Sequence, residues 1–249
     1  MGQNRFPIWS PDGQRVAFQS DREGDLAIFS QRTDGSGSVE RLTKPEQGEV
    51  HVPESWSPDG KLISFAVTKG PAFSLWTVTV ADRKIAPFGT VQSAEPISSV
   101  FSPDGQWIAY TSTPVSGGAS SPNRGVYVQP VPATGARYQI PRQQLDFHPV
   151  WGPKGTELFY VPTAASGQLA VVNVTTQRGV TFGTPVTLPA RVTGSRTSLE
   201  TRAWDILPDG RFVGVVPESE ADSSAAAAAP QFRVVLNWFE ELKARVPTN

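Results

Sequence analysis

The chain has 249 residues, with 22 basic and 23 acidic side chains and a formal net charge of −1. It contains no cysteine, which excludes disulfides, zinc–thiolate sites and a cysteine nucleophile. The even balance of charge favours neither a nucleic-acid nor a membrane-surface partner. No stretch has the length and hydrophobicity of a membrane span, and the first residues lack the apolar core of a secretion signal. We therefore expect a soluble chain that carries no export signal and does not insert into a membrane.

One short motif recurs along the chain and organises it. An aromatic or apolar residue is followed by one further residue, then Pro, then Asp or Lys, then Gly; the copies are 9–13, 56–60, 101–105, 151–155 and 206–210. Their prolines lie about 45 to 55 residues apart, a period typical of propellers and similar arrays. Proline presets φ for a β-turn, Asp bonds back to the chain, and Gly accepts a positive φ. We therefore assign these aspartates to the turn and not to chemistry, and expect the aromatic residue to pack between neighbouring blades.

The segments between these motifs predict four strands per repeat. In the first repeat they are 6–10, 15–20, 26–31 and 39–43, with turns at 21–25 and 33–37. The later strands are expected at 62–68, 74–80, 84–88, 107–112, 125–131, 137–141, 157–161, 168–174, 185–188, 202–207, 211–216 and 231–236. Four short strands joined by Gly and Asp turns form one propeller blade.

These strands predict an all-β chain: a β-propeller of five recognisable blades over residues 1–236. The blades cover about 6–45, 46–92, 93–145, 146–200 and 201–236. The fifth is incomplete, because no outer strand is predicted and the alanines at 225–229 are too few to nucleate a helix. We expect those alanines to form a hairpin tip.

Residues 237–249 change from strand to helical spacing. Trp238, Phe239, Leu242 and Val246 recur on one helical face, and Asn237 can cap its start. A helix of roughly nine residues is not stable alone, so it must dock on the body of the protein. A partner-binding helix is the alternative.

Six polar residues lie at or just before the predicted inner strands, where loops gather around the mouth of the central channel. They are His51, Glu54, Glu95, Asp146, His148 and Arg202. We predict that they line a ligand-binding funnel. Two histidines and a carboxylate could hold a metal ion, but the polar lining of a wet channel is the favoured interpretation, so we expect no metal and no cofactor. If the protein were an enzyme, Asp146 and His148 would be its acid and base.

Other signatures of chemistry are incomplete. Asp21, Glu23 and Asp25 have the spacing that opens a calcium loop, but Arg32 stands where such a loop needs its last carboxylate. A hairpin turn is therefore the better interpretation. The chain has no Gly-x-Ser-x-Gly elbow, no Gly-rich nucleotide loop and no kinase catalytic-loop motif. Peptidase or kinase chemistry of those types is not expected within it.

The run from Phe6 to Gly24, with Trp-Ser-Pro-Asp-Gly, Val-Ala-Phe and Ser-Asp-Arg, and the later Arg-Leu-Thr at 41–43, resembles the repeats of TolB-type bacterial β-propellers, which are WD-repeat-like. The third repeat keeps Ser-Pro-Asp-Gly and Ile-Ala-Tyr. The tail at 234–243 resembles the end of propellers that, in some proteins, follow a Ser/Thr kinase domain and a membrane span. The resemblance implies an interaction platform, a sensor or a peptidase lid, in a periplasmic or other extracytoplasmic location.

The chain departs from this family in two respects. TolB has six blades and a smaller second domain, whereas five repeats are recognisable here. Only residues 1–5 precede the first predicted strand, too few to supply the strand that usually closes the ring. Either the ring closes around an incomplete blade, or the chain is the C-terminal part of a longer protein, and we favour the second interpretation.

These observations predict a non-catalytic binding module. It would present a site for a protein or peptide partner, or for a small ligand, at the channel mouth. The alternative is a hydrolase or lyase with a carboxylate and histidine site at the same place.

Overall fold

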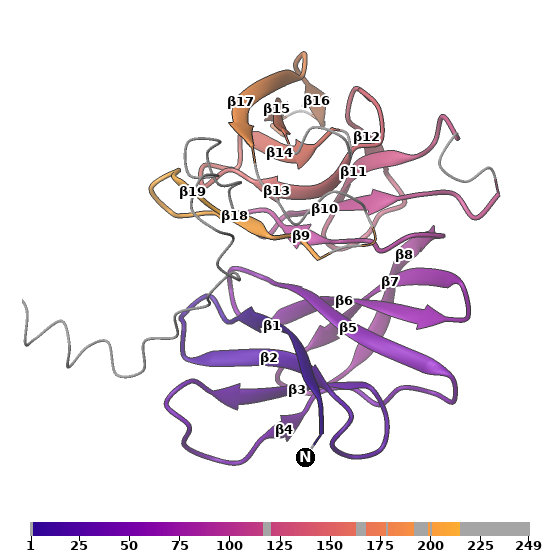
Figure 1. Ribbon diagram of the computed structural model, residues 1–249, viewed down its shortest axis with the longest axis vertical. Coiled ribbons are helices and arrows are strands. Elements are labelled where there is room, and N and C mark those ends of the chain that lie inside the picture. The colour runs from indigo at the N-terminus through magenta and orange to yellow at the C-terminus, as the bar shows by residue number, and fades with distance from the viewer. Residues whose placement is uncertain are drawn as a thin grey trace, which may run out of the picture. The chain divides into compact units, whose positions relative to one another are not determined.

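The computed structural model describes residues 2–116, 121–162, 168–177, 179–191, 199 and 201–214. Within these ranges the regular secondary structure consists entirely of antiparallel β-sheets (Figure 1). The predicted helix at 237–246, the strand at 231–236 and the alanine segment at 225–229 lie outside the described residues. The all-β prediction is confirmed for the part of the chain that is described.

The sheets follow the repeats, and we call them blades 1 to 5. Blade 1 contains β1 (Asn4–Trp9), β2 (Arg15–Ser20), β3 (Ala27–Arg32) and β4 (Glu40–Arg41). Blade 2 contains β5 (Glu49–Trp56), β6 (Leu62–Lys69), β7 (Ala72–Thr79) and β8 (Ile85–Ser93). Blade 3 contains β9 (Val100–Phe101), β10 (Trp107–Ser112), β11 (Gly125–Pro130) and β12 (Tyr138–Gln139). The strands of each blade pair in chain order.

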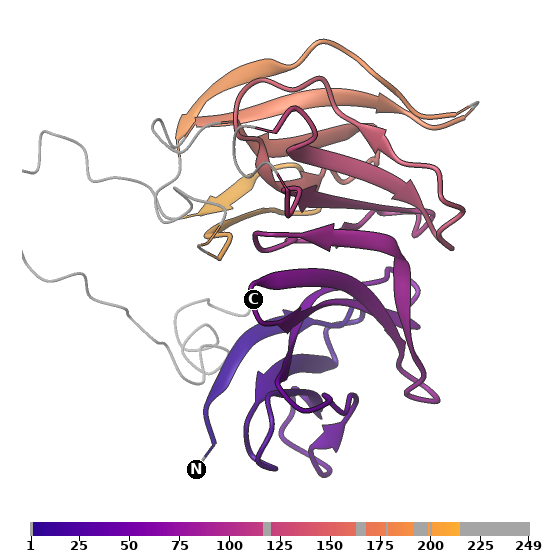
Figure 2. The same cartoon turned by 90° about the vertical axis from the view of Figure 1, so that its right-hand side faces the viewer.

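Blade 4 contains β13 (Phe147–Trp151), β14 (Glu157–Val161) and β15 (Gln168–Thr175), with both β16 (Thr181–Phe182) and β17 (Val186–Arg191) paired to β15. Only two strands of blade 5 are described, β18 (Trp204–Ile206) and β19 (Phe212–Gly214). Consecutive blades contact one another (Figure 2). The structure differs from the sequence prediction in detail: β1 starts two residues earlier, and β16 was not expected.

The recurring motif forms the same hydrogen-bonded turn in each of the first three blades. In blade 2 the Ser57 hydroxyl donates to Asp59 Oδ1 at 2.7 Å and accepts the Leu62 N–H at 2.8 Å. Asp59 Oδ1 also accepts the Lys61 N–H at 3.1 Å, and Gly60 has φ of 75°. These hydrogen bonds, with that from Ser57 first, lower the pKa of Asp59. The aspartates therefore serve the turn, as the sequence predicted.

Each interior blade packs one face, which we call its leading face, against the preceding blade. The leading face of blade 2 carries Trp56, Ile63 and Phe65, which pack with Ala17 and Ile28 of blade 1. The aligned residues of blade 3 are Phe101, Ile108 and Tyr110, and those of blade 4 are Trp151, Leu158 and Tyr160; both sets are buried. The motif aromatic is thus an inter-blade residue in blades 2 to 4.

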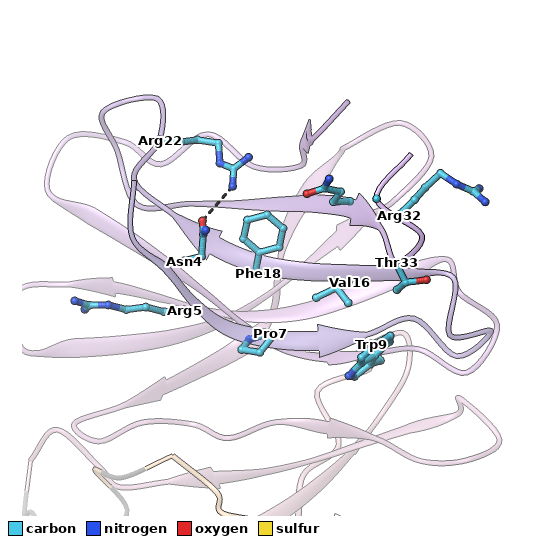
Figure 3. A pocket seen from close by; sticks show the side chains of 11 residues that line it. Asn4, Arg5, Pro7, Trp9, Val16, Phe18, Arg22, Arg32 and Thr33 are labelled. Atoms are coloured by element: carbon cyan, nitrogen blue, oxygen red, sulfur yellow. Dashed lines mark hydrogen bonds between the residues drawn. The ribbon is translucent and has the colours of Figure 1, made fainter. Parts of the chain in front are cut away.

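Blade 1 is the exception, and here the prediction for the aromatic residue is wrong. Trp9 is 64% exposed, and Val16 and Phe18 are only half-buried. These side chains line an open pocket of about 490 Å³, with Arg22 and Asn4 hydrogen-bonded at its edge (Figure 3). The reason is that no sheet of the described chain packs on the leading face of blade 1.

The segment considered as a calcium loop forms a turn. The Gly24 N–H donates to the Asp21 carbonyl at 2.9 Å, and Arg41 forms ion pairs with Glu23, at 2.8 Å, and with Asp25. Among the described residues no group of three His, Asp or Glu side chains is placed to hold a metal ion. No helix in the same residues is long and apolar enough to cross a membrane.

Candidate functional site

The inner strands share an irregularity where they pass the centre of the sheet assembly. The residue three before the motif aromatic has positive φ in three blades: Phe6 (52°), Ser98 (52°) and His148 (54°). The pairing register of β1 and of β13 shifts next to this position. Non-glycine residues rarely adopt this conformation, so the surrounding packing must enforce it. In blade 2 the position is Pro53, whose ring fixes φ at a negative value.

A cavity of about 620 Å³ lies against these irregular positions. Its apolar wall comes from β1, β5 and β7 and includes Phe6, Ile8, Val52 and Phe73. Its polar lining comes from the second, third and fifth repeats and consists of Glu54, Ser98, Ser99, Thr201 and Arg202. A concave, mostly apolar space with a few convergent polar groups is the usual form of a ligand site.

Glu54 is held by the backbone of the next blade. Its two carboxylate oxygens accept the N–H of Ser98 at 2.9 Å and that of Ser99 at 2.8 Å. Burial raises the pKa of Glu54, because a carboxylate deep in the protein loses hydration, and these hydrogen bonds only partly oppose that effect. Glu54 therefore links blades 2 and 3 at the cavity wall.

Arg202 reaches the cavity from the segment before β18. Its Nε–H donates to the Trp204 carbonyl at 3.0 Å and its Nη1 to the Pro149 carbonyl at 3.4 Å. Its Nη2 lies 3.7 Å from Asp205, an exposed carboxylate. Loss of hydration lowers the pKa of Arg202, while the negative charges of Asp205 and Glu54 oppose that shift. The guanidinium of this half-buried side chain is thus oriented by two backbone carbonyls.

His148 supports the cavity from behind. Its ring Nδ1 lies 3.0 Å from the Ser98 hydroxyl, and the ring packs edge-on against Phe147. The backbone N–H of His148 donates to Thr111 Oγ1 at 3.3 Å. The side chain has no exposed surface, whereas Ser98 lines the cavity. His148 can therefore fix the orientation of Ser98.

The other three predicted residues lie in separate environments. The Asp146 carboxylate accepts the N–H groups of Gln143 and Gln144 at 2.9 and 3.4 Å, and its burial raises its pKa. Glu95 pairs with Arg124 at 2.9 Å and accepts the Thr113 hydroxyl at 3.0 Å.

His51 is buried beside Phe65, with Nε2 3.7 Å from Glu49 Oε2, and burial lowers its pKa. The structure thus gathers Glu54, His148 and Arg202 around Ser98. Sequence reasoning missed Ser98, although it occupies the same place in its repeat as His148, three residues before the motif aromatic.

Comparison with known proteins agrees with this fold. No protein-family model matches the chain. The Tol-Pal system protein TolB of Anaeromyxobacter sp. strain K is 32% identical over 137 residues, which are 55% of this chain and 29% of the relative. The crystal structure of TolB from Acinetobacter baumannii superposes with a TM-score of 0.57 at 20% identity, over 75% of this chain and 45% of that one. This chain is a TolB-like β-propeller.

A second relative shares only part of the propeller. YuxL of Bacillus subtilis, named as an uncharacterized peptidase, is 46% identical over 70 residues, 28% of this chain and 10% of the relative. The propeller spans less than a third of the length of these two curated relatives. The solved structure of a putative TolB from Agrobacterium tumefaciens, at a TM-score of 0.52 and 19% identity, covers 72% of this chain and 64% of that one and supports the same fold.

Proposed function

We propose that this propeller is a non-catalytic binding module that holds a peptide segment of a partner protein in the cavity between its inner strands. Its five blades would form the C-terminal sensor part of a longer polypeptide. The observation that carries the proposal is the cavity itself, in which apolar side chains from several blades surround Glu54, Ser98 and Arg202. An extended peptide supplies both apolar side chains and backbone polar groups, which suits this lining.

The relatives support a role in protein interaction without naming a partner for this chain. One is named as a protein of the Tol-Pal system. The near-neutral charge of the chain agrees with a protein or peptide ligand more readily than with nucleic acid. A small ligand in the same cavity is the alternative within the binding class.

A hydrolase is the second candidate, favoured by one contact. Ser98 Oγ lies 3.0 Å from His148 Nδ1, which is the spacing of a nucleophile and its base. However, Glu54 accepts the backbone N–H groups of Ser98 and Ser99, which are the donors that an oxyanion would need. The Asp146 carboxylate accepts backbone N–H groups of its own loop. These contacts favour a structural role for the Ser98–His148 pair.

The binding proposal can be tested by blocking the cavity. Peptides selected from a phage-displayed random library on the purified chain would be labelled, and their Kd measured by fluorescence anisotropy. Val52→Trp fills the wall of the cavity and should weaken binding by at least about tenfold. Val186→Trp, at an exposed site on β17, is the matched control and should change nothing. Peptides that bind Val52→Trp as tightly as the wild type would contradict the proposed location.

The hydrolase candidate has its own test. A fluorophosphonate probe reacts with activated serines, and we expect no labelling of the wild-type chain. Labelling of Ser98 that disappears in both Ser98→Ala and His148→Ala would overturn the non-catalytic assignment. If labelling did occur, Asp146→Ala would show whether Asp146 takes part. The variant should lower labelling of Ser98 only if Asp146 acts together with His148.

A further inference from the structure

We infer that the cavity recognises a carboxylate group that stands next to an apolar group, as at the free C-terminus of a peptide, and that Arg202 is its anchor. This inference rests on the proposed binding function, and it adds the chemistry of the ligand. The observations that carry it are the contacts of the guanidinium, the state of the neighbouring carboxylate and the composition of the wall.

Hydrogen bonds hold the Arg202 guanidinium in place, but no carboxylate of the described residues is hydrogen-bonded to it. Two carbonyl oxygens, of Trp204 and Pro149, accept from Nε and Nη1 and hold the plane of the guanidinium. Within the described part of the chain the nearest carboxylate is that of Asp205, which lies 3.7 Å from Nη2, longer than a hydrogen bond, and is itself well exposed. A guanidinium has five N–H donors, so several remain for a ligand. Among the described residues this half-buried guanidinium has no carboxylate at hydrogen-bond distance, and a bound carboxylate would supply one.

Glu54 does not fill that role. Both of its oxygens already accept backbone N–H groups, from Ser98 and Ser99. Glu54 is therefore engaged with blade 3, and no described carboxylate lies at hydrogen-bond distance from the Arg202 guanidinium.

The apolar wall of the cavity indicates which class of anion fits. Phe6, Ile8, Val52 and Phe73 give the cavity an apolar side within about 620 Å³, enough for a side chain as well as a carboxylate. A single guanidinium matches one negative charge, and a carboxylate can accept two of its N–H groups together. A phosphate dianion would bring a second charge close to Glu54 with no cation to meet it. A carboxylate with an adjacent apolar group fits both features.

The experiment compares acids with their amides. The probes are N-acetylphenylalanine and its primary amide, and the tetrapeptide acetyl-Gly-Gly-Leu-Phe as free acid and as amide, each titrated into the full chain by calorimetry. We expect the acids to bind at least about tenfold more tightly than the amides. A gain in affinity from the amino acid to the tetrapeptide would identify a peptide C-terminus as the source of the carboxylate, and equal affinities would identify a small organic acid.

Variants locate the effect. Arg202→Gln should abolish the difference between acid and amide, whereas Arg137→Gln, outside the cavity, should keep it. Arg202→Lys retains the charge and should keep a reduced preference for the acid, and it serves if the Gln variant does not fold. Glu54→Gln removes a nearby negative charge and should strengthen acid binding.

Acids and amides that bind equally, an acid preference that survives Arg202→Gln, or no binding of either acid would each overturn the inference. If acid and amide bound equally well and Val52→Trp abolished the binding of both, the carboxylate assignment would be wrong. The cavity would still be a peptide-binding site. The failure of this inference is therefore distinguishable from failure of the proposed function.

Discussion

Trp9 and Trp56 occupy the same position in neighbouring repeats, yet they differ in environment. Both precede Ser-Pro-Asp-Gly and end an inner strand, but Trp9 is 64% exposed and Trp56 is 9% exposed. The turns that follow them have the same hydrogen bonds: the hydroxyls of Ser10 and Ser57 donate to the aspartate two residues on, at 2.6 and 2.7 Å. The comparison teaches that the motif specifies the turn locally, whereas burial of its aromatic depends on a neighbouring blade.

The largest expected effect is the difference in stability lost when each of the two tryptophans is replaced by alanine. Trp56→Ala removes a side chain that packs with Ile63 and Ala17 and donates to the Gly60 carbonyl at 3.0 Å, so we expect a loss of about 3–5 kcal/mol. Trp9→Ala should change the free energy of unfolding by less than about 0.5 kcal/mol. Denaturant unfolding followed by circular dichroism measures both. Equal losses would mean that the face of blade 1 is covered in solution.

A smaller effect should be the same in both blades. Ser57→Ala and Ser10→Ala each remove a hydroxyl that bridges the turn, and each should cost about 1 kcal/mol. Blade 4 has Gly152 at this position, where an added Cβ would come within 3.2 Å of the Phe159 ring. Gly152→Ser should therefore give no gain in stability. Unequal losses at Ser10 and Ser57 would show that covering the leading face also strengthens the turn.

The smallest expected effect is a difference in how stability depends on pH between Glu54, at the cavity, and Asp59, in the turn. The folded-state pKa of Glu54 is raised, so its contribution to stability is present below the ordinary glutamate pKa and is lost as pH rises through the folded-state value. The pKa of Asp59 is lowered, so its contribution is lost as pH falls. Relative to wild type, Glu54→Gln should therefore gain stability between pH 4 and 7.

Asp59→Asn should lose stability relative to wild type as the pH rises from the lowered folded-state pKa of Asp59 through the ordinary value of 3.8, a window below that of Glu54. Urea unfolding at several pH values measures both slopes. Slopes of the same sign in the two variants would contradict the assigned environments.

The inner strands also differ from blade to blade in the residues at equivalent positions. Two positions before the motif aromatic, blade 1 has Pro7, blade 2 has Glu54, blade 3 has Ser99 and blade 4 has Pro149. The place in the repeat is the same from blade to blade, but its chemistry is set by the individual residue. Position in the repeat could therefore locate the cavity, and it led to Glu54, His148 and Arg202 as candidates. It could not tell which candidates meet there.

Asp146, Glu95 and His51 show why. Each lies in or shortly before an inner strand, and Glu54 lies within β5, yet Asp146 binds its own loop, Glu95 pairs with Arg124 and His51 packs on Phe65. A shift of one residue along a strand turns a side chain to the opposite face. The register shifts in β1, β5 and β13 are produced by the packing of the sheet and have no clear signature in sequence.

The sequence by itself determined the repeat, the turn chemistry and the all-β class, because proline, aspartate and glycine act through bonds within five residues of one another. Only the tertiary structure decided that Trp9 stays open while Trp56 is buried, and that Ser98 joins Glu54, His148 and Arg202 at one cavity. Those outcomes depend on contacts between different blades, with sequence separations of 44 for Glu54–Ser98, 50 for Ser98–His148 and 53 for Arg202–Pro149, and such contacts form only once the blades have packed.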